Sequence, residues 1–154
     1  MKKFKFPLEA LLKVTKMEKE KAEVELAKIS KLLTEQQEYM EKLRQEMQQG
    51  QKDYERLTEG ARITVGTLMT YNSFFAWKRE QLQLQDEAIL QSKAQKSKRL
   101  QQLLAIRNKL ESIEQLREKR FNEFRQEQLF EEQKQLDEIG LQIYTRRVRR
   151  GEEQ

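Results

Sequence analysis

Hydrophobic residues recur along the first half of the chain at alternating spacings of four and three residues. The repeat begins at Leu8 and keeps one register to Ala61. A 3.5-residue repeat of this length specifies the seam of a left-handed coiled coil, and a disordered chain has no physical reason to hold such a register. The pattern therefore predicts one long helix. Its expected core residues are Leu12, Leu26, Ile29, Leu33 and Leu43.

A less regular repeat runs through the second half of the chain. Apolar residues there fall at multiples of seven from one another, and the polar stretch 91–99 interrupts them. This spacing predicts a second long helix that packs on the first through the same kind of seam. Its expected core residues are Leu82, Ile89, Leu103 and Leu110.

Glycine and proline mark the boundaries of these helices. Residues 8–49 and 67–139 contain neither residue, whereas Gly60 and Gly66 lie between the two segments. We predict helices at about 7–60 and 65–140, a turn at about 61–66 and a basic tail at 141–154, with Thr64 or Thr67 as the N-cap of the second helix. A connection this short makes the helices antiparallel neighbours. The predicted fold is all-α: a single domain, residues 1–154, forming an antiparallel left-handed coiled-coil hairpin.

The second predicted helix is longer than the first. It overhangs its partner by roughly twenty residues, or ~30 Å at the rise of an α-helix. Exposed apolar groups on an unpaired helix indicate a binding partner, and the alternative is that Phe4 and Phe6 fold back onto part of the overhang. Both can hold, since Phe4 and Phe6 lie at the same end of the hairpin. The apolar residues in question are Phe121, Phe124, Leu129, Phe130, Leu136 and Ile139.

Three large aromatic residues open the second helix. Phe74, Phe75 and Trp77 together span about 300° of its circumference, so they cannot all face one seam. Phe75 fits the heptad, and we expect Phe74 or Trp77 to be partly exposed as an interaction surface. The alternative is that Ile63 and Val65 of the turn cover them.

Composition excludes most other architectures and most chemistry. The chain has 154 residues, of which 37% are charged and 36% hydrophobic, with only five Gly and one Pro. So few breakers do not supply the turns of a sheet fold. The absence of Cys and His removes thiol and imidazole chemistry, and no phosphate-binding loop motif is present. We therefore expect no enzymatic activity, no cofactor and no metal site.

The net charge of +5 is concentrated in two places. A basic band lies between residues 88 and 110, and Arg146, Arg147, Arg149 and Arg150 form a cluster. Acidic residues of the partner helix are expected to balance the band, with an acidic protein surface as the alternative. The arginine cluster is typical of a solvated terminus, and RNA, lipid or an acidic groove are its alternative partners. No apolar run reaches the ~18 residues of a membrane span, and charges interrupt any signal sequence, so we expect a cytoplasmic protein.

Three stretches of the chain, in this order, resemble the flagellar export protein FliJ family. They are the opening F-x-F-P-L-x-x-L-L at residues 4–12, the sequence YNSFF at residues 71–75 and the sequence EQKQLDE at residues 132–138. The resemblance covers nearly the whole chain.

The resemblance implies a non-enzymatic stalk in flagellar type III protein export. Family members are coiled coils similar to the γ stalk of rotary ATP synthases. They occupy the centre of the hexameric export ATPase FliI, promote its assembly and turnover, bind the export gate protein FlhA and hand over export chaperones. The implied location is the cytoplasm, peripherally at the cytoplasmic face of the membrane. Nucleic acid is not among the implied partners.

The resemblance also implies two binding surfaces. The paired termini would enter the ATPase ring, and the start of the second helix would bind the gate. The ring-binding residues are then Phe4, Phe6, Phe121, Phe124, Leu129, Phe130 and Leu136. The gate-binding positions are Phe74, Lys78, Gln81 and Gln85, with Trp77 beside them. The alternative functions are the equivalent stalk of a virulence-type secretion ATPase, a basic adaptor for nucleic acid or membrane, and a coiled-coil scaffold without an ATPase.

Overall fold

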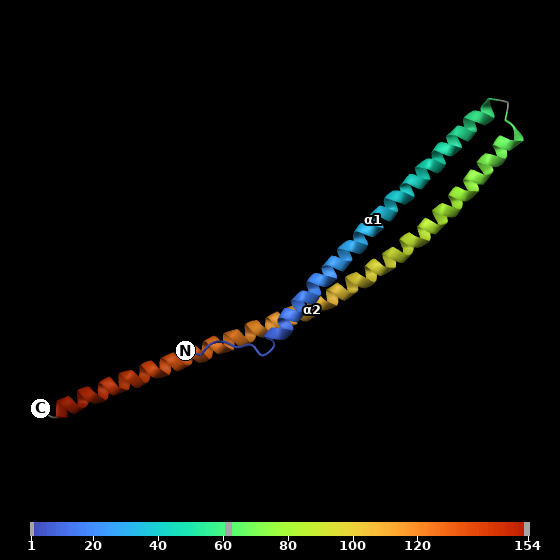
Figure 1. Cartoon of the computed structure of the whole chain (residues 1–154). Coiled ribbons are helices and arrows are strands. Elements are labelled where there is room, and N and C mark those ends of the chain that lie inside the picture. The colour runs from blue at the N-terminus through green and yellow to red at the C-terminus, as the bar shows by residue number, and fades with distance from the viewer. Residues whose placement is uncertain (1, 61–62, 153–154) are drawn as a thin grey trace. The chain divides into compact units, whose positions relative to one another are not determined.

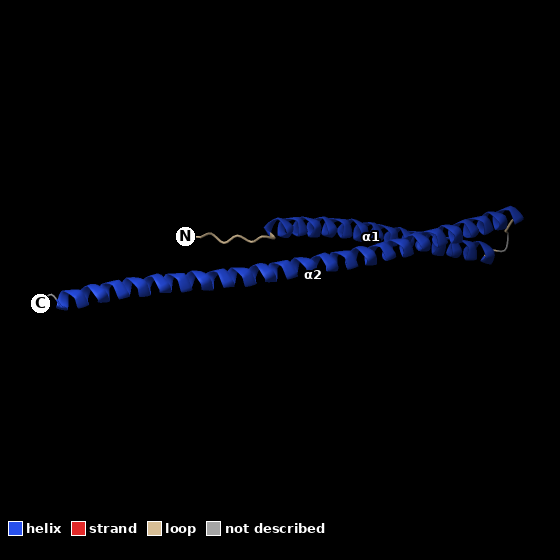
Figure 2. Cartoon of the chain, turned by 90° about the horizontal axis from the view of Figure 1, so that it is seen from below, coloured by secondary structure: helices blue, strands red, loops and turns tan. Residues whose placement is uncertain are grey.

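The computed structural model describes residues 2–60 and 63–152 of the chain. It contains two helices, α1 (Glu9–Glu59) and α2 (Val65–Glu152), which pack against each other as a hairpin (Figure 1). No strand occurs in the described ranges, and the residues before α1 are extended (Figure 2). The predicted all-α coiled-coil hairpin is confirmed. Of the predicted turn, residues 61–62 lie outside the described residues.

The starts of both helices follow from local hydrogen bonding. Pro7 lies in a turn just before α1, where Glu9 N donates to Phe6 O over 3.1 Å. At the start of α2, Thr67 N donates to Thr64 Oγ1 over 3.2 Å. Thr64 rather than Thr67 is therefore the N-cap, because its side chain accepts from one of the first free amides of the helix.

The end of α2 differs from the prediction. The helix continues past Gly140 to Glu152, so the segment expected to be a basic tail is helical as far as the structure describes it. A single Gly costs a helix only about 1 kcal/mol relative to Ala, which neighbouring helix-forming residues offset. Glycine alone was thus too weak a signal to end the helix.

Two compact units make up the hairpin. Unit 1 comprises Met1–Met17 with Arg107–Gln154, and unit 2 comprises Glu18–Ile106. In unit 2, Leu33, Met40 and Ile89 form a buried cluster against which Leu82 packs. Among the other expected core residues of this unit, Leu43 and Leu103 are buried, and Leu26 and Ile29 are half-buried.

Unit 1 has its own core. Phe6, Leu12, Leu110 and Ile113 are buried together, and Phe4 and Leu116 pack against them. Phe6 precedes α1, so the extended N-terminal residues contribute directly to the packing of the two helices. Burial of each such apolar side chain stabilises the unit by about 1.5–3 kcal/mol relative to exposure.

Next to the turn, aromatic rings fill the seam of unit 2. The Tyr54 ring lies 5.5 Å from that of Tyr71 and 6.0 Å from that of Phe75, measured between centroids. Gly50 is buried against Phe74, and a Cβ atom at position 50 would lie 2.5 Å from Phe74 Cε1. Glycine is therefore needed in this seam position because the Phe74 ring occupies the space of a side chain.

The basic band is balanced in part by the partner helix. Arg99 Nη1 on α2 donates to Glu25 Oε2 on α1 over 2.8 Å. This ion pair between the helices matches the expectation that acidic residues of the first helix face the band. Both side chains are partly exposed, so solvent screens the attraction and the contribution to stability is small.

Candidate partner-binding surfaces

The N-terminal residues of unit 1 lie along α2. The Phe4 ring contacts the Phe121 ring edge-on, with centroids 5.3 Å apart, and lies 5.6 Å from the Phe124 ring. Arg117 places its guanidinium over the Phe4 ring at 5.7 Å and donates from Nε to Glu9 Oε2 over 3.1 Å. Part of the apolar surface expected on the overhang is therefore covered by the chain's own Phe4, whereas Phe6 packs with Leu110 and Ile113.

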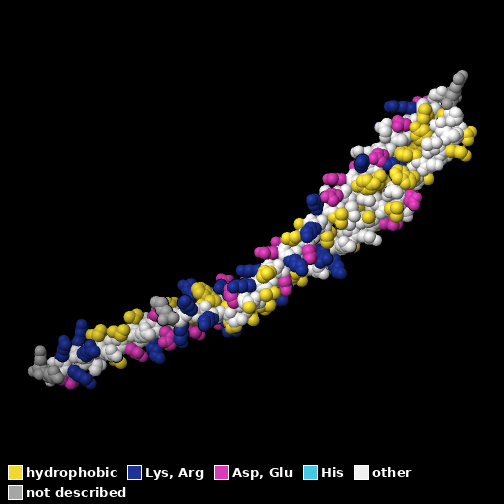
Figure 3. All heavy atoms as spheres, viewed as in Figure 1, with side chains coloured by type: hydrophobic (Ala, Val, Ile, Leu, Met, Phe, Trp, Pro, Cys, Tyr) yellow, Lys and Arg dark blue, Asp and Glu magenta, His cyan; other side chains and the backbone are white. Residues whose placement is uncertain are grey.

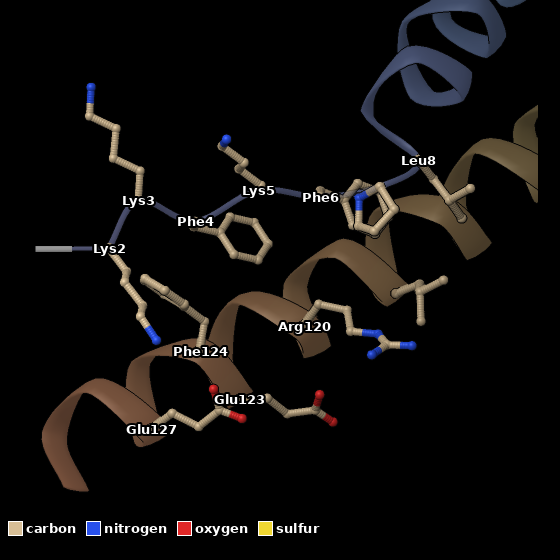
Figure 4. A pocket seen from close by; sticks show the side chains of 12 residues that line it. Lys2, Lys3, Phe4, Lys5, Phe6, Leu8, Arg120, Glu123, Phe124 and Glu127 are labelled. Atoms are coloured by element: carbon tan, nitrogen blue, oxygen red, sulfur yellow. The ribbon is translucent and has the colours of Figure 1, made fainter. Parts of the chain in front are cut away.

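This fold-back leaves an open pocket beside the aromatic contact. Phe4, Phe6 and Phe124 supply apolar walls, and charged residues including Arg120 and Glu127 surround them. In Figure 4, Lys2 extends toward α2, whereas Lys3 and Lys5 extend away from it. The pocket is thus a partly apolar surface with a mixed charged rim, available to a side chain of a partner.

Beyond the fold-back, α2 is uncovered. Every residue from 129 to 152 is exposed, and this range is called here the exposed segment. Leu136 and Phe130 keep 62% and 70% of their surface, and Leu129 and Ile139 are also exposed. Apolar side chains lie between charged ones along this part of the molecule (Figure 3). Such side chains at regular helical spacing form an apolar surface along which another helix is able to pack.

Most of the residues matched to a gate-binding face point into the hairpin. Lys78 is only 4% exposed and pairs with Glu46 of α1. Gln85 Nε2 donates to Gln36 O over 2.9 Å, and Phe74 and Gln81 are half-buried. Trp77 differs from them, because 53% of its surface is exposed. The expectation that Phe74 or Trp77 is exposed is met by Trp77.

The buried Lys78 ammonium is held by charge and by aromatic rings. Its Nζ lies 5.1 Å from the centroid of the Trp77 ring and 5.7 Å from that of Phe74. The hydrogen bond from Lys78, helped by the positive charges of Lys78 and Lys42, lowers the pKa of Glu46 below its ordinary value of 4.5, against the raising effect of burial. Glu46 therefore stays ionised and compensates the ammonium.

The chain matches one known protein family over most of its length. Residues 4–149 match the family described as Flagellar FliJ protein. The chain belongs to the FliJ family. Comparison with curated proteins gave no match. Comparison with solved structures gave none either.

Membership of the FliJ family makes the chain a non-enzymatic component associated with flagellar protein export. The match extends over both helices, so it includes the fold-back, the turn and most of the exposed segment. In residues 2–60 and 63–152, neither helix has a stretch long and apolar enough to span a membrane. The same ranges hold no group of three or more carboxylate side chains arranged to bind a metal ion.

The pairing of Lys78 with Glu46 was missed in the sequence. Its signal was available, because Lys78 lies three residues after Phe75 and four before Leu82, which is a seam position of the second heptad repeat. A lysine in such a position requires a counter-charge from the facing helix. The first helix offers several carboxylates near that level, and periodicity alone does not select Glu46 among them.

Proposed function

We propose that the chain is a central-stalk-like coiled coil that binds the hexameric flagellar export ATPase, FliI, and promotes its assembly and activity. The observation that carries this proposal is the exposed segment, where apolar side chains such as Phe130 and Leu136 lie in solvent on an intact helix. Side chains of this size forfeit about 1.5–3 kcal/mol each when left in water, so contact with a ring of subunits is favourable.

The charges next to the exposed segment suit a contact that forms and releases. Just before this segment, acidic and basic residues are mixed around Phe121 and Phe124, including Arg120, Glu123 and Arg125. Mixed charges at the rim of an interface guide orientation and association more than they add affinity. A stalk inside a cycling ATPase needs this balance, because very tight binding to one subunit would stall the cycle.

The exposed Trp77 side of α2 is the second proposed contact, to the export gate protein FlhA. Trp77 keeps 53% of its surface in solvent, whereas Lys78 is buried and pairs with the partly exposed Glu46 of α1. On this proposal Trp77 touches the gate, and Phe74, Lys78, Gln81 and Gln85 position it by holding α2 against α1. Loss of gate binding in Trp77→Ala with an unchanged helical content would support the assignment, and unchanged binding would contradict it.

The remaining parts of the proposal concern location and cargo. Binding to both the ATPase and the gate would hold the chain peripherally at the cytoplasmic face of the membrane. The long hairpin surface is then available to the export chaperones that deliver substrates. The virulence-type stalk is disfavoured by the match to the flagellar family over residues 4–149.

The test of the proposed function uses the full chain with its cognate export ATPase. ATP hydrolysis and ring assembly are measured with and without the chain over a range of concentrations. We expect stimulation that saturates near one chain per hexamer, since a central stalk occupies a single axial position. No change in turnover or in assembly at saturating concentration would contradict the proposal.

A further inference from the structure

Charge is segregated along the exposed segment. Its first half is acidic apart from Lys134, and its second half is basic, with no acidic residue between Glu138 and Glu152. Within the described part of the chain, no ion pair is found for any of these charged side chains. The acidic residues are Glu131, Glu132, Asp137 and Glu138, and the basic ones are Arg146, Arg147, Arg149 and Arg150.

One face of this helix continues the coiled-coil repeat without a partner helix. Seven residues follow one another at spacings of three and four, which confines them to an arc of about 100° at 100° per residue. All of them are exposed. In order along the helix they are Leu129, Glu132, Leu136, Ile139, Ile143, Arg146 and Arg150. The face therefore has an apolar centre, an acidic residue toward its N-terminal end and basic residues toward its C-terminal end.

We propose that a second copy of this chain occupies this face, with the two exposed segments antiparallel. When Ile139 packs against the partner's Ile143, a step of seven residues along both helices brings Glu132 opposite the partner's Arg150. Two-fold symmetry makes every such pair occur twice. A parallel arrangement instead places like charges opposite each other, so the charge pattern selects the antiparallel one.

The layer between the Ile139–Ile143 pair and the Glu132–Arg150 pair is also complementary. Leu136 lies opposite the partner's Arg146, whose aliphatic stem covers apolar surface while its guanidinium stays in solvent. The interface has few apolar layers, so the dimer is weak, with a dissociation constant on the order of micromolar. Its charge pairs lie at the surface, and added salt screens them.

The pairing goes beyond the proposed function and does not depend on it. If both hold, the dimer covers the same side chains that contact the export ATPase. The free chain would then shield its apolar surface in the dimer, and the ATPase would compete with the second copy for it.

The first experiment is a charge exchange in the full chain, followed by sedimentation equilibrium. Glu132→Arg and Arg150→Glu each place like charges opposite one another twice, and we expect about a tenfold weaker dimer for each. Mixing the two variants, or combining both changes in one chain, restores opposite charges and the original affinity. Glu87→Arg, an exposed reversal outside the segment, is the control and leaves the affinity unchanged.

The second experiment fixes the direction and register. The chain has no cysteine, so single introduced cysteines report one position each. We expect oxidation of a mixture of Ile139→Cys and Ile143→Cys to yield mainly the mixed disulfide, because these positions face each other and meet the short Cβ separation that a disulfide requires. Preferential cross-linking of each variant with itself would contradict the antiparallel pairing.

Three results would overturn the proposal: a monomer at all concentrations up to about a hundred times the expected dissociation constant, a dimer insensitive to both reversals, or a monomer captured by phosphatidylglycerol vesicles through its arginines. ATPase stimulation, measured separately on the same variants, distinguishes this failure from that of the proposed function. A chain that remains monomeric and still stimulates the ATPase refutes the pairing alone.

Discussion

The covered seam of unit 2 and the exposed segment of α2 use the same helix and similar side chains, with opposite outcomes. Leu103 retains 2% of its surface because α1 packs over it, whereas Leu136 retains 62%. Both lie in repeats of three and four residues. The difference shows that an apolar heptad defines a surface for packing and does not by itself provide the partner. The seam of unit 2 contributes to stability, and the exposed segment remains available for binding.

The largest expected effect is the difference in unfolding free energy lost when a buried leucine and its exposed neighbour are each replaced by alanine. Leu103→Ala removes a buried side chain and is expected to cost about 2–5 kcal/mol of unfolding free energy. Leu104→Ala, at a residue 47% exposed, is expected to stay within about 0.5 kcal/mol. Urea unfolding followed by circular dichroism measures both. Equal losses for the two variants would show that α1 does not cover this part of α2 as described.

The second prediction contrasts two helical glycines and expects opposite signs. In Gly50→Ala the new methyl group collides with the Phe74 ring, and such overpacking typically costs about 1–3 kcal/mol. In Gly140→Ala nothing lies within 4 Å of the new atom, and better helix propensity stabilises the segment by up to about 1 kcal/mol. Thermal unfolding of both variants tests the contrast, and stabilisation by Gly50→Ala would refute the close packing of Phe74.

A smaller effect is expected at the start of α2. Thr64→Ala removes the side-chain acceptor of Thr67 N and should cost about 1 kcal/mol, the usual value for an N-cap threonine. Thr70→Ala is the matched control, because its hydroxyl only donates to Gly66 O within the helix. Hydrogen exchange of the first amides of α2 reports the loss directly. Faster exchange in the control alone would assign the cap elsewhere.

The smallest effect is a dependence on acid pH. Because the folded-state pKa of Glu46 is lowered, its contribution is fully present above the unfolded-state value and is lost as the pH falls through the folded-state value. Glu46→Gln should therefore destabilise the hairpin at neutral pH and flatten the decline in stability below about pH 4.5. Unfolding measured from pH 3 to pH 7 tests this. A decline as steep as in the natural chain would show that other carboxylates cause it.

The sequence was sufficient for the hairpin and for the location of the exposed surface. A heptad held from Leu8 onward admits few structures, and the unequal helix lengths follow from the positions of Gly60 and Gly66. The contact of Phe4 with Phe121 and Phe124 is compatible with a partner on the rest of the overhang, and the sequence left both open. Establishing this contact required geometry, because a short extended segment carries no periodicity.

Other features depended on contacts that a one-dimensional pattern does not contain. The partner of Lys78 and the need for glycine opposite Phe74 both depend on which residues of α1 lie opposite which residues of α2. The helical state of residues 141–152 has a different cause, because the helix propensity of the residues around Gly140 outweighs the cost of about 1 kcal/mol for a single glycine.

The central claim is that the exposed segment carries the contact with the export ATPase. The most direct test compares stimulation of the cognate ATPase by the full-length double variant Phe130→Ser with Leu136→Ser and by the control variant Leu104→Ser, with folding of each verified by circular dichroism. We predict that the double variant loses at least tenfold in apparent affinity for the ring, or about 1.4 kcal/mol, while the control keeps normal stimulation. Full stimulation by the double variant, or loss of stimulation by the control alone, would contradict the claim.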